Sequence, residues 1–405
     1  MVILKMAFRN IFRQKRRTFF TGLSIVGGFT LAVVFIGWAD GSYNNIIDQF
    51  TSNRLGHIQI HEKTYLDRPS LYKTIDAAPK IGAILDQAES VESWAPRVYG
   101  AGLAAVGEKS AGVQIIGLDP HRENATTHFD RKIVRGRSFS GLRAGEVVLG
   151  KGLAEILQAK TGDHVVLVSQ AADGSIAQDL YLLVGIAATG DDLSDRMSFF
   201  LPLGTAQDYL VLGDRLHEIA VVVDRLSRVN RIAATLSGLI DDPALSVEPW
   251  QVFAQSFYEA MRADKAGMWV MLVIIVVIVA VGVLNTVLMS VLERRREYGL
   301  LKAVGTRPRQ IVRLVLLEIM VLSLIAMIVG AGLGLGTNAI LSRHGIKFSS
   351  GLTYGGMVFD TMKSEINLRS FVIPAITVIL SAVLVSLVPA VKAARTEPAK
   401  TMRMH

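Results

Sequence analysis

The chain has 405 residues, of which 51% are hydrophobic, and it carries a formal net charge of +8. Its mean hydropathy of +0.39 is high for a soluble globular protein. The sequence contains no cysteine, which excludes disulfides, thiolate metal sites and a cysteine nucleophile.

The positive charge is distributed unevenly. Residues 41–265 carry 22 basic and 28 acidic side chains, whereas segments 1–17, 293–313 and 392–405 together hold 17 basic residues against three acidic ones. These basic segments flank long apolar runs, so anionic lipid headgroups and membrane topology account for the charge. We therefore expect membrane lipids as partners and no binding to nucleic acid.

The first 40 residues are expected to form an interfacial helix and the first transmembrane helix. Residues 1–17 place apolar and basic side chains on different helical faces, which is typical of a helix on the inner leaflet. The 21 uncharged residues from Phe19 to Ala39 can then cross a bilayer. A cleaved signal peptide is the alternative, but both its basic and its apolar regions would be unusually long.

In residues 41–265, helical and strand patterns alternate, which predicts a mixed α/β domain of one or two lobes. Helical patterns continue past the first apolar run to about Leu55 and precede the second one from Gln251. Asp173-Gly174 is typical of a hairpin turn. Five segments between these helices are predicted as strands: GHIQIH, GEVVLG, HVVLV, LYLLV and IAVVV.

One segment of this domain partly matches a nucleotide-binding motif. Gly145–Gly152 matches the P-loop pattern except at its last position, where Gly152 replaces the hydroxyl residue that binds magnesium. The middle of the segment is typical of a strand rather than a phosphate-binding loop. We therefore expect no nucleotide here.

Metal sites and catalytic residues are not expected either. His57 and His61 would lie about 13 Å apart along a strand, too far to share one metal ion. Three acidic residues could hold calcium but are more typical of a solvated loop: Asp191, Asp192 and Asp195. No hydrolase motif occurs, and the residues that would bind a substrate are unknown.

Residues 266–405 contain three more apolar runs long enough to cross a bilayer, Ala266–Leu292, Leu314–Ser342 and Ser370–Val391. In the last run, Pro374 is expected to kink the helix and Pro389 to end it.

The Leu314–Ser342 run contains two GxxxG spacings, formed by Gly330, Gly332, Gly334 and Gly336. Such spacings let another helix approach closely. A loosely packed glycine-rich helix is the alternative.

Between the second and third runs lies the segment Glu293–Arg313, which we call the charged corner. It holds seven basic and two acidic residues, an excess typical of a cytoplasmic loop. Gly305 is predicted to stop one helix, Thr306 to cap the next and Pro308 to fit its first turn. Four spans then place both termini and the charged corner in the cytoplasm and the α/β domain outside.

Glu318 is the one ionisable residue within the predicted spans. It lies five residues after Arg313 and could pair with it or extend toward the headgroups. A structural pairing is the favoured interpretation, and a functional role stays open.

The charged corner resembles the ERRREIGLLKAxG signature of MacB/LolC-type ABC transporter permeases, also called type VII or mechanotransmission transporters. Three further segments resemble this family in the same order along the chain: RNIFRQKRRTFFTGLSIVGG, GEVVLGKGLAEIL with TGDHVVL, and PAVKAARTEPAKTMR. The resemblance covers nearly the whole chain.

This resemblance implies an α-helical membrane protein with four transmembrane helices and a mixed α/β extracytoplasmic domain. The chain would be a non-catalytic permease subunit, paired with a second copy or a paralogue and bound to an ABC ATPase dimer. ATP and magnesium would be bound by that ATPase, so this chain itself would need no cofactor. The stalk helices, Ser42–Leu55 and Gln251–Lys265, would transmit ATPase closure to the outer domain. The implied ATPase-coupling residues are Glu293, Arg294, Glu297, Gly299, Lys302, Ala303 and Gly305.

Within the family we favour extraction or export of a lipophilic or lipidated substrate, as in lipoprotein release, from the bacterial inner membrane. A periplasmic adaptor or acceptor is then a further expected partner. The alternative is a transmembrane signalling subunit that activates a cell-wall hydrolase. The predicted hairpin Val165–Val184 is short and lacks proline, which argues against the hook-bearing lipoprotein subunit but not against a hookless one.

Overall fold

The computed structural model describes Met6, Arg9 and residues 15–354 and 357–396. The chain divides into a helical unit, residues 1–45, 261–347 and 361–405, and an α/β unit, residues 46–260 and 348–360. Most of the interfacial helix predicted over residues 1–17, and the tail beyond residue 396, lie outside the described residues.

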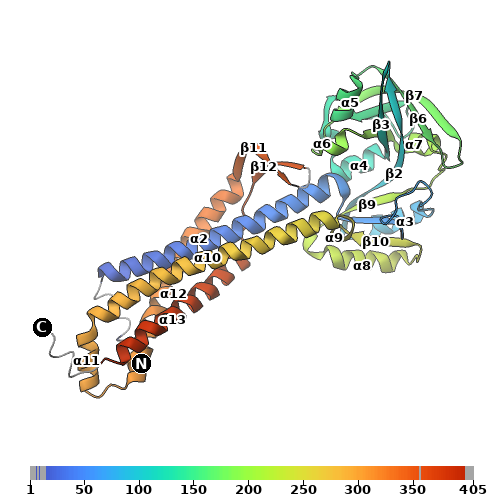
Figure 1. The fold of residues 1–405 in the computed structure, drawn as a ribbon. Helices are drawn as coiled ribbons and strands as arrows, with labels where there is room; N and C mark the ends of the chain where they lie inside the picture. Colours follow the sequence, from blue (N-terminus) through green and yellow to red (C-terminus); the bar gives the residue numbers. More distant parts are fainter. Residues whose placement is uncertain (1–5, 7–8, 10–14, 355–356, 397–405) are drawn as a thin grey trace. The chain divides into compact units, whose positions relative to one another are not determined.

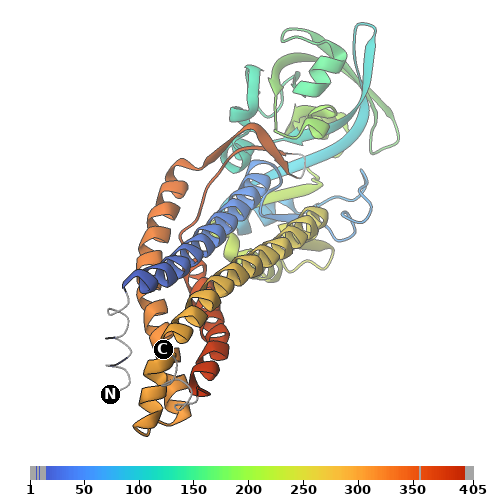
Figure 2. The ribbon, with the colours of Figure 1, turned by 60° about the vertical axis from the view of Figure 1, so that its left-hand side comes forward.

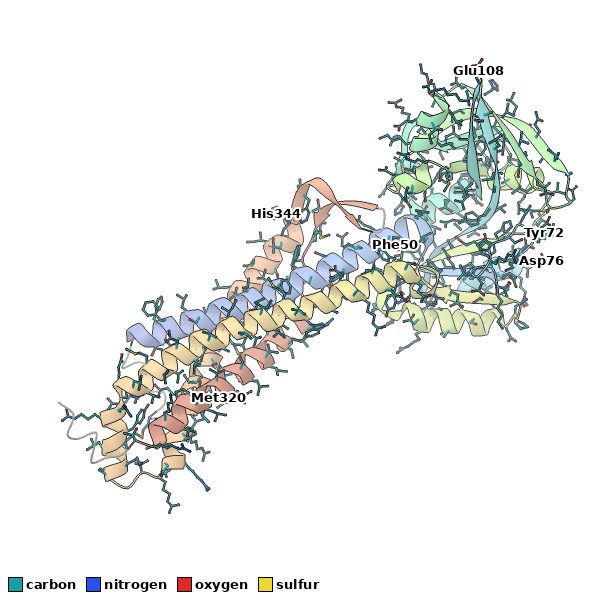
Figure 3. All side chains as sticks on the ribbon, in the orientation of Figure 1. Phe50, Tyr72, Asp76, Glu108, Met320 and His344 are labelled. Atoms are coloured by element: carbon teal, nitrogen blue, oxygen red, sulfur yellow. The ribbon has the colours of Figure 1, made fainter. Side chains whose placement is uncertain are left out.

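Four long helices make up most of the helical unit: α2 (Lys15–Phe50), α10 (Gln255–Glu293), α12 (Pro308–His344) and α13 (Arg369–Ala394). Each contains an apolar stretch long enough to cross a membrane. Many apolar side chains of these helices are exposed, for example Ile278 and Ile328. Figure 3 draws the side chains along the helices, with Met320 of α12 labelled. The prediction of four apolar spanning helices is confirmed.

The short helix α11 (Arg295–Ala303) joins α10 to α12 (Figure 1, Figure 2).

The prediction that Pro389 ends the last helix is wrong, because α13 continues for five more residues to Ala394. Proline removes one backbone donor from a helix. Here the surrounding turn is held by packing, since Pro389, Ala390 and Ala393 are all buried.

The glycines of α12 divide into two groups. A Cβ on Gly330 would lie 2.8 Å from Phe29 Cδ1, and one on Gly334 would lie 2.8 Å from Val33 Cγ1, so both glycines let α2 approach. A Cβ on Gly332 or Gly336 would meet nothing within 4 Å. Within this chain, Gly330 and Gly334 therefore allow α2 to approach closely, whereas Gly332 and Gly336 lie on an exposed face and their packing role stays a prediction.

Ten strands of the α/β unit form one hydrogen-bonded sheet: β1 (Ile58–Glu62), β2 (Val91–Val106), β3 (Lys109–Leu118), β4 (Ile133–Gly136), β5 (Glu146–Gly150), β6 (His164–Gln170), β7 (Ile176–Ala187), β8 (Ser198–Pro202), β9 (Glu218–Val223) and β10 (Leu245–Pro249). The five strands predicted from the sequence lie in β1, β5, β6, β7 and β9. The helices of this unit are α3 (Ala78–Gln87), α4 (Pro120–Thr127), α5 (Lys151–Leu157), α6 (Asp192–Asp195), α7 (Leu203–Tyr209), α8 (Val229–Ile240) and α9 (Trp250–Phe253).

The sheet has two lobes that share the long strand β2. The second half of β2 pairs with β6, and the pairings β2–β3–β8–β5–β7–β6–β2 close a ring. The first half of β2 pairs with β9, which continues the sheet to β1 and β10. The pairs β3–β8 and β5–β7 are parallel and the others are antiparallel, so the predicted mixed α/β domain is confirmed.

Three further segments differ from the sequence interpretation. The loop expected between the third and fourth spans contains a hairpin of β11 (Ile346–Tyr354) and β12 (Met357–Met362). After α2, a π-helical turn covers Thr51–Leu55. The second predicted stalk segment, Gln251–Lys265, is interrupted at Ala254, between α9 and α10.

Candidate functional site

The charged corner is a helical bend followed by a tight turn. Helix α11 ends at Ala303, and Gly305 adopts a φ of +98°, a conformation that favours glycine. Gly305 N donates to Lys302 O at 3.0 Å. The predicted helix stop at Gly305 is thus present, but the N-cap of α12 is Arg307 rather than Thr306. The Arg307 N–H donates to Gln310 Oε1 at 2.8 Å, which satisfies one donor at the helix start.

Arg294 lies at the bend between α10 and α11 and is only 7% exposed. Its Nε donates to Glu297 Oε2 at 2.9 Å, and its Nη1 donates to Glu318 Oε2 at 3.1 Å. A structural pairing of Glu318 is therefore present, but Arg313 is the wrong partner. Arg313 is exposed, whereas the chain reversal through α11 brings Arg294 against α12.

The guanidinium of Arg294 stays charged in this buried position. Burial by itself would lower the pKa of Arg294. The electrostatic interactions with Tyr298 and Glu318 and the hydrogen bond to Glu297 have a larger effect and hold the pKa above its ordinary value. The guanidinium carbon lies 5.4 Å from the centre of the Tyr298 ring. Arg294 is thus a positioning residue inside the corner and does not belong to its outer surface.

One face of α11 is buried in the helical unit. Tyr298 is 1% exposed and packs in the core cluster that contains Ile311 and Val315. Gly299 is also buried, whereas Ala303 is exposed. These two implied coupling residues therefore have different surroundings, and their part in ATPase docking stays a prediction.

Lys302 is held inside the fold as well. Its Nζ donates to Ala394 O at 3.1 Å and to Thr396 O at 2.8 Å. These carbonyls lie at the end of α13, where helical carbonyls lack partners and a positive charge is favourable. Lys302 therefore ties α11 to the end of the last long helix.

The outer face of α11 carries a stripe that the sequence interpretation missed. Arg296, Leu300 and Val304 are exposed and spaced four residues apart, so they lie on one helical face. Leu300 is 59% exposed and Val304 is 82% exposed. We call these three residues the outer stripe. The four-residue spacing was readable in the sequence, but which face of α11 is buried was not.

Two of the predicted coupling carboxylates lie close to this stripe. Glu293 is exposed at the end of α10, and the side chain of Glu297 is 41% exposed while it pairs with Arg294. The corner therefore presents apolar, basic and acidic groups together on a short, firmly held helix.

A small polar cavity of about 30 Å³ lies behind the corner, which is enough for about one water molecule. Its lining includes Thr21 of α2, Thr286 and Ser290 of α10, and Glu318 of α12. These polar side chains come from three separate helices, so no spacing in the sequence brings them together.

The P-loop-like segment has no room for a phosphate. Strand β5 runs directly into α5, and the end of α6, at Asp195 and Arg196, packs against the junction. A Cβ on Gly150 would collide with Asp195 O, and one on Gly152 would lie 2.6 Å from Arg196 Cγ. This close packing explains both glycines without a nucleotide.

The histidines and aspartates considered as metal ligands have protein partners. His57 Nδ1 accepts from Val223 N at 3.0 Å, and His61 Nε2 lies 3.2 Å from Gln59 Oε1. Asp191 pairs with Arg54, and Asp195 accepts from the Thr189 hydroxyl at 2.7 Å. Within the described residues, no group of three or more potential ligands is arranged to hold a metal ion.

Comparison with known proteins gives two family matches. The model described as MacB-like periplasmic core domain matches residues 18–239, which is more than half of the chain. The model described as FtsX-like permease C-terminal matches residues 269–398.

The chain is also similar to individual proteins. The lipoprotein-releasing system transmembrane protein LolC of Neisseria meningitidis serogroup B is 23% identical, with 96% of this chain and 96% of the relative covered. LolE of Haemophilus influenzae is 21% identical, with 95% and 94% covered. The macrolide export ATP-binding/permease protein MacB of Wolinella succinogenes is 22% identical, with 84% of this chain and 54% of the relative covered.

Among solved structures, the periplasmic region of MacB from Actinobacillus actinomycetemcomitans matches with a TM-score of 0.38 and 17% identity, covering 50% of this chain and 94% of that structure. The two family matches confirm the resemblance drawn from the sequence motifs. The chain therefore belongs to the MacB/LolC-type family of ABC transporter permeases and is a membrane-embedded bacterial permease.

Proposed function

We propose that this chain is the non-catalytic permease subunit of an ABC transporter and that a separate ATPase docks on the charged corner. The observation that carries the proposal is the construction of that corner. A short helix is fixed from behind by Arg294, Tyr298 and Lys302 and presents an exposed outer stripe. Exposed apolar side chains beside charged ones are typical of a protein contact surface.

A separate ATPase is favoured by what the chain contains. The one P-loop-like segment is filled by its own neighbours, and the relatives named lipoprotein-releasing system transmembrane proteins match this chain over nearly their whole length. ATP and magnesium would then be bound by an ATPase dimer. This dimer would bind two permease subunits, which are either two copies of this chain or this chain and a paralogue.

Force would pass to the α/β unit through the ends of α2 and α10. In the helical unit, Tyr43 OH of α2 donates to Asp264 Oδ2 of α10 at 2.8 Å. In the α/β unit, the rings of Phe50 and Phe257 stack with 3.8 Å between their centres. A paired, laterally bonded stalk transmits a tilt without a substrate channel through the bilayer.

For the substrate we propose a lipophilic or lipidated molecule, as in lipoprotein release. Support comes from the relatives named lipoprotein-releasing system proteins, which match over nearly their whole length. The β6–β7 connection contains only residues 171–175, so the hairpin has no extension of the hook type. The membrane would be the bacterial inner membrane, with both termini and the charged corner in the cytoplasm and a periplasmic acceptor beyond the α/β unit.

Docking is tested by placing charge on the outer stripe. The double variant Leu300→Asp/Val304→Asp is co-expressed with an ABC ATPase that co-purifies with the wild-type chain, and the amount of bound ATPase is measured. Burying two unpaired carboxylates in an interface costs several kcal/mol, and each 1.4 kcal/mol reduces affinity tenfold. We expect at least a tenfold loss of bound ATPase with normal membrane insertion.

The matched control is Leu239→Asp on α8, because Leu239 is 56% exposed and lies outside the corner. This variant should retain the ATPase. Equal ATPase binding by the double variant and the control would contradict docking at this stripe. For the substrate, ATP-dependent release of an acylated lipoprotein from proteoliposomes holding both subunits is expected, and its absence with an active ATPase would contradict that part of the proposal.

A further inference from the structure

The α/β unit contains a cavity of about 290 Å³ that the proposed function does not use. A water molecule occupies about 30 Å³, so the space corresponds to about ten waters and reaches the lower range of small-ligand sites. The sheet supplies one wall, with Arg97 on β2, Ile116 on β3, Phe200 on β8 and Glu218 on β9. The remaining lining residues from the sheet and the surrounding loops include Tyr65, Tyr99, Gln114, Leu118, Thr189, Ser194 and Ser198.

A buried ionic group fixes the inner end of this cavity. Arg97 Nη2 donates to Glu123 Oε1 at 2.7 Å, and Nη1 donates to Glu218 Oε1 at 2.9 Å. The Tyr99 hydroxyl donates to the same Glu218 oxygen at 3.2 Å, and the Thr127 hydroxyl donates to Glu123 Oε1 at 2.8 Å. Burial of such charges is costly and is weak evidence for a stabilising role. Its main effect here is a rigid, polar wall.

Three cations, Arg54, Arg97 and Lys132, and two carboxylates, Glu123 and Glu218, line the cavity. Just outside the lining, Asp191 pairs with Arg54, and the charge of Asp195 acts on Lys132, so these two carboxylates offset part of the positive charge. Burial also raises the pKa of Glu218, only partly offset by Arg97, which favours its neutral form and increases the positive balance.

The cations are close enough to affect one another. Burial lowers the pKa of Lys132 to about 8. The charges of Arg97 and Arg54 act in the same direction, and those of Glu123 and Asp195 oppose it. The Lys132 Nζ donates to Thr127 Oγ1 at 3.2 Å. A bound anion would lower the mutual repulsion of these three groups.

An apolar surface adjoins the cationic side. The Lys132 Nζ lies 6.0 Å from the centre of the Phe129 ring, and the Phe129 and Phe200 rings meet edge to face at 5.1 Å. Ile116 and Leu118 extend this surface along β3. The cavity thus offers charge and apolar contact to the two ends of one small molecule.

We propose that this cavity binds a small amphipathic organic anion, with its acidic group beside Lys132 and Arg54 and its apolar part against Phe129 and Phe200. Arg54 belongs to the π-helical turn that follows α2, and π-helical turns occur frequently at functional sites. The ligand would therefore contact the segment through which the stalk enters the α/β unit, and it would stabilise that segment when bound.

The test uses 4-fluorobenzoate as the probe and the purified full chain in detergent micelles, with fluorine NMR and empty micelles as the reference. Saturable binding is expected, and the neutral analogue 4-fluorobenzamide should bind at least tenfold more weakly. Lys132→Met should reduce the affinity for the anion about tenfold, the size expected from loss of one charge-assisted contact. Lys132→Arg should restore it.

The matched control is Arg131→Met, which removes the same charge from the exposed neighbouring residue and should change the affinity less than twofold. Hydrogen exchange of the backbone amides of residues 51–55 should slow with the probe in the wild type. The proposal is overturned by absence of saturable binding up to the solubility limit, or by equal binding of the two probes. The comparison of probes on the wild type decides the question even if Lys132→Met fails to fold.

Discussion

The guanidinium of Arg294 joins two helices of the charged corner, because Glu297 lies on α11 and Glu318 on α12. The pair with Glu318 is shielded, with the Arg294 side chain 8% exposed and that of Glu318 17% exposed. A shielded pair gains little over a well-packed apolar pair, but removal of one partner leaves an uncompensated charge. The corner is therefore sensitive to loss of Arg294 in a way that its exposed arginines are not.

Arg294→Met is expected to destabilise the chain by about 3 kcal/mol, the usual cost of breaking a buried ion pair. The measurement is thermal unfolding of the purified chain in detergent. Arg295→Met, at the exposed neighbouring position, should have little effect. Adding Glu318→Gln to Arg294→Met should recover part of the loss. A double variant no more stable than Arg294→Met alone would count against a direct pair.

His61 makes the stability of the α/β unit dependent on pH. Its ring is fully buried, and burial lowers the pKa of His61 from 6.5 to about 4. Because the pKa of His61 is lower in the folded chain than in the unfolded chain, the unfolded chain takes up the proton first as the pH falls. Above pH 6.5 the ring is neutral in both states, and the folded chain has its full stability. The contribution of the neutral ring is lost as the pH falls from 6.5 to about 4. At 1.36 kcal/mol for each pH unit, the full loss is about 3 kcal/mol.

We expect the wild type to lose more stability between pH 6.5 and 4 than His61→Phe, which cannot take up the proton. Thermal unfolding of the full chain across this pH range measures the difference. His164→Phe, which removes an exposed histidine of β6, should keep the wild-type pH dependence. Parallel curves for the wild type and His61→Phe would contradict the assignment.

At the scale of elements, α12 presents two different glycine faces. Gly330 and Gly334 lie against Phe29 and Val33 of α2, whereas Gly336 faces open space. Val33 is β-branched and stiff, so it cannot easily yield to an added methyl group. The α2–α12 contact therefore depends on one GxxxG spacing, and the other is free of that constraint.

Gly334→Ala should destabilise the helical unit by about 1–3 kcal/mol, the usual cost of overpacking. Gly336→Ala adds the same methyl group on the same helix and should change stability by less than about 0.5 kcal/mol. Both are measured by unfolding in the same detergent. Similar losses for the two variants would show that helix flexibility, not contact with α2, is what matters.

At the scale of the whole molecule, the orientation in the membrane can be tested through the absence of cysteine. The charged corner and the β6–β7 hairpin should lie on opposite sides of the membrane. Val304→Cys is exposed at the corner, and Asp173→Cys is placed at the hairpin turn. In spheroplasts, an impermeant thiol reagent should label only Asp173→Cys.

In cells without the partner ATPase, which would cover Val304, the same reagent should label both variants after permeabilisation. Labelling of Val304→Cys in intact spheroplasts, with Asp173→Cys protected, would reverse the proposed topology. Each variant carries a single thiol, so any labelling reports the accessibility of that one position.

The sequence by itself determined the features that depend on neighbouring residues. The four spans follow from uninterrupted apolar length, and five strands follow from short apolar runs bounded by turn residues. The stop at Gly305 follows from local backbone preference. The family followed from motifs along nearly the whole chain, and two family models confirmed it.

Only the tertiary structure decided which groups meet across long stretches of chain. Arg294 pairs with Glu318, α13 continues past Pro389, and β2 pairs with both β9 and β6. The cavity beside Lys132 likewise takes its walls from distant segments of the sequence. Local preference is weaker than tertiary packing, and which face of a helix or strand is buried depends on elements far away in the chain. Such contacts leave no periodicity or spacing in one sequence, so they become visible only when the chain is folded.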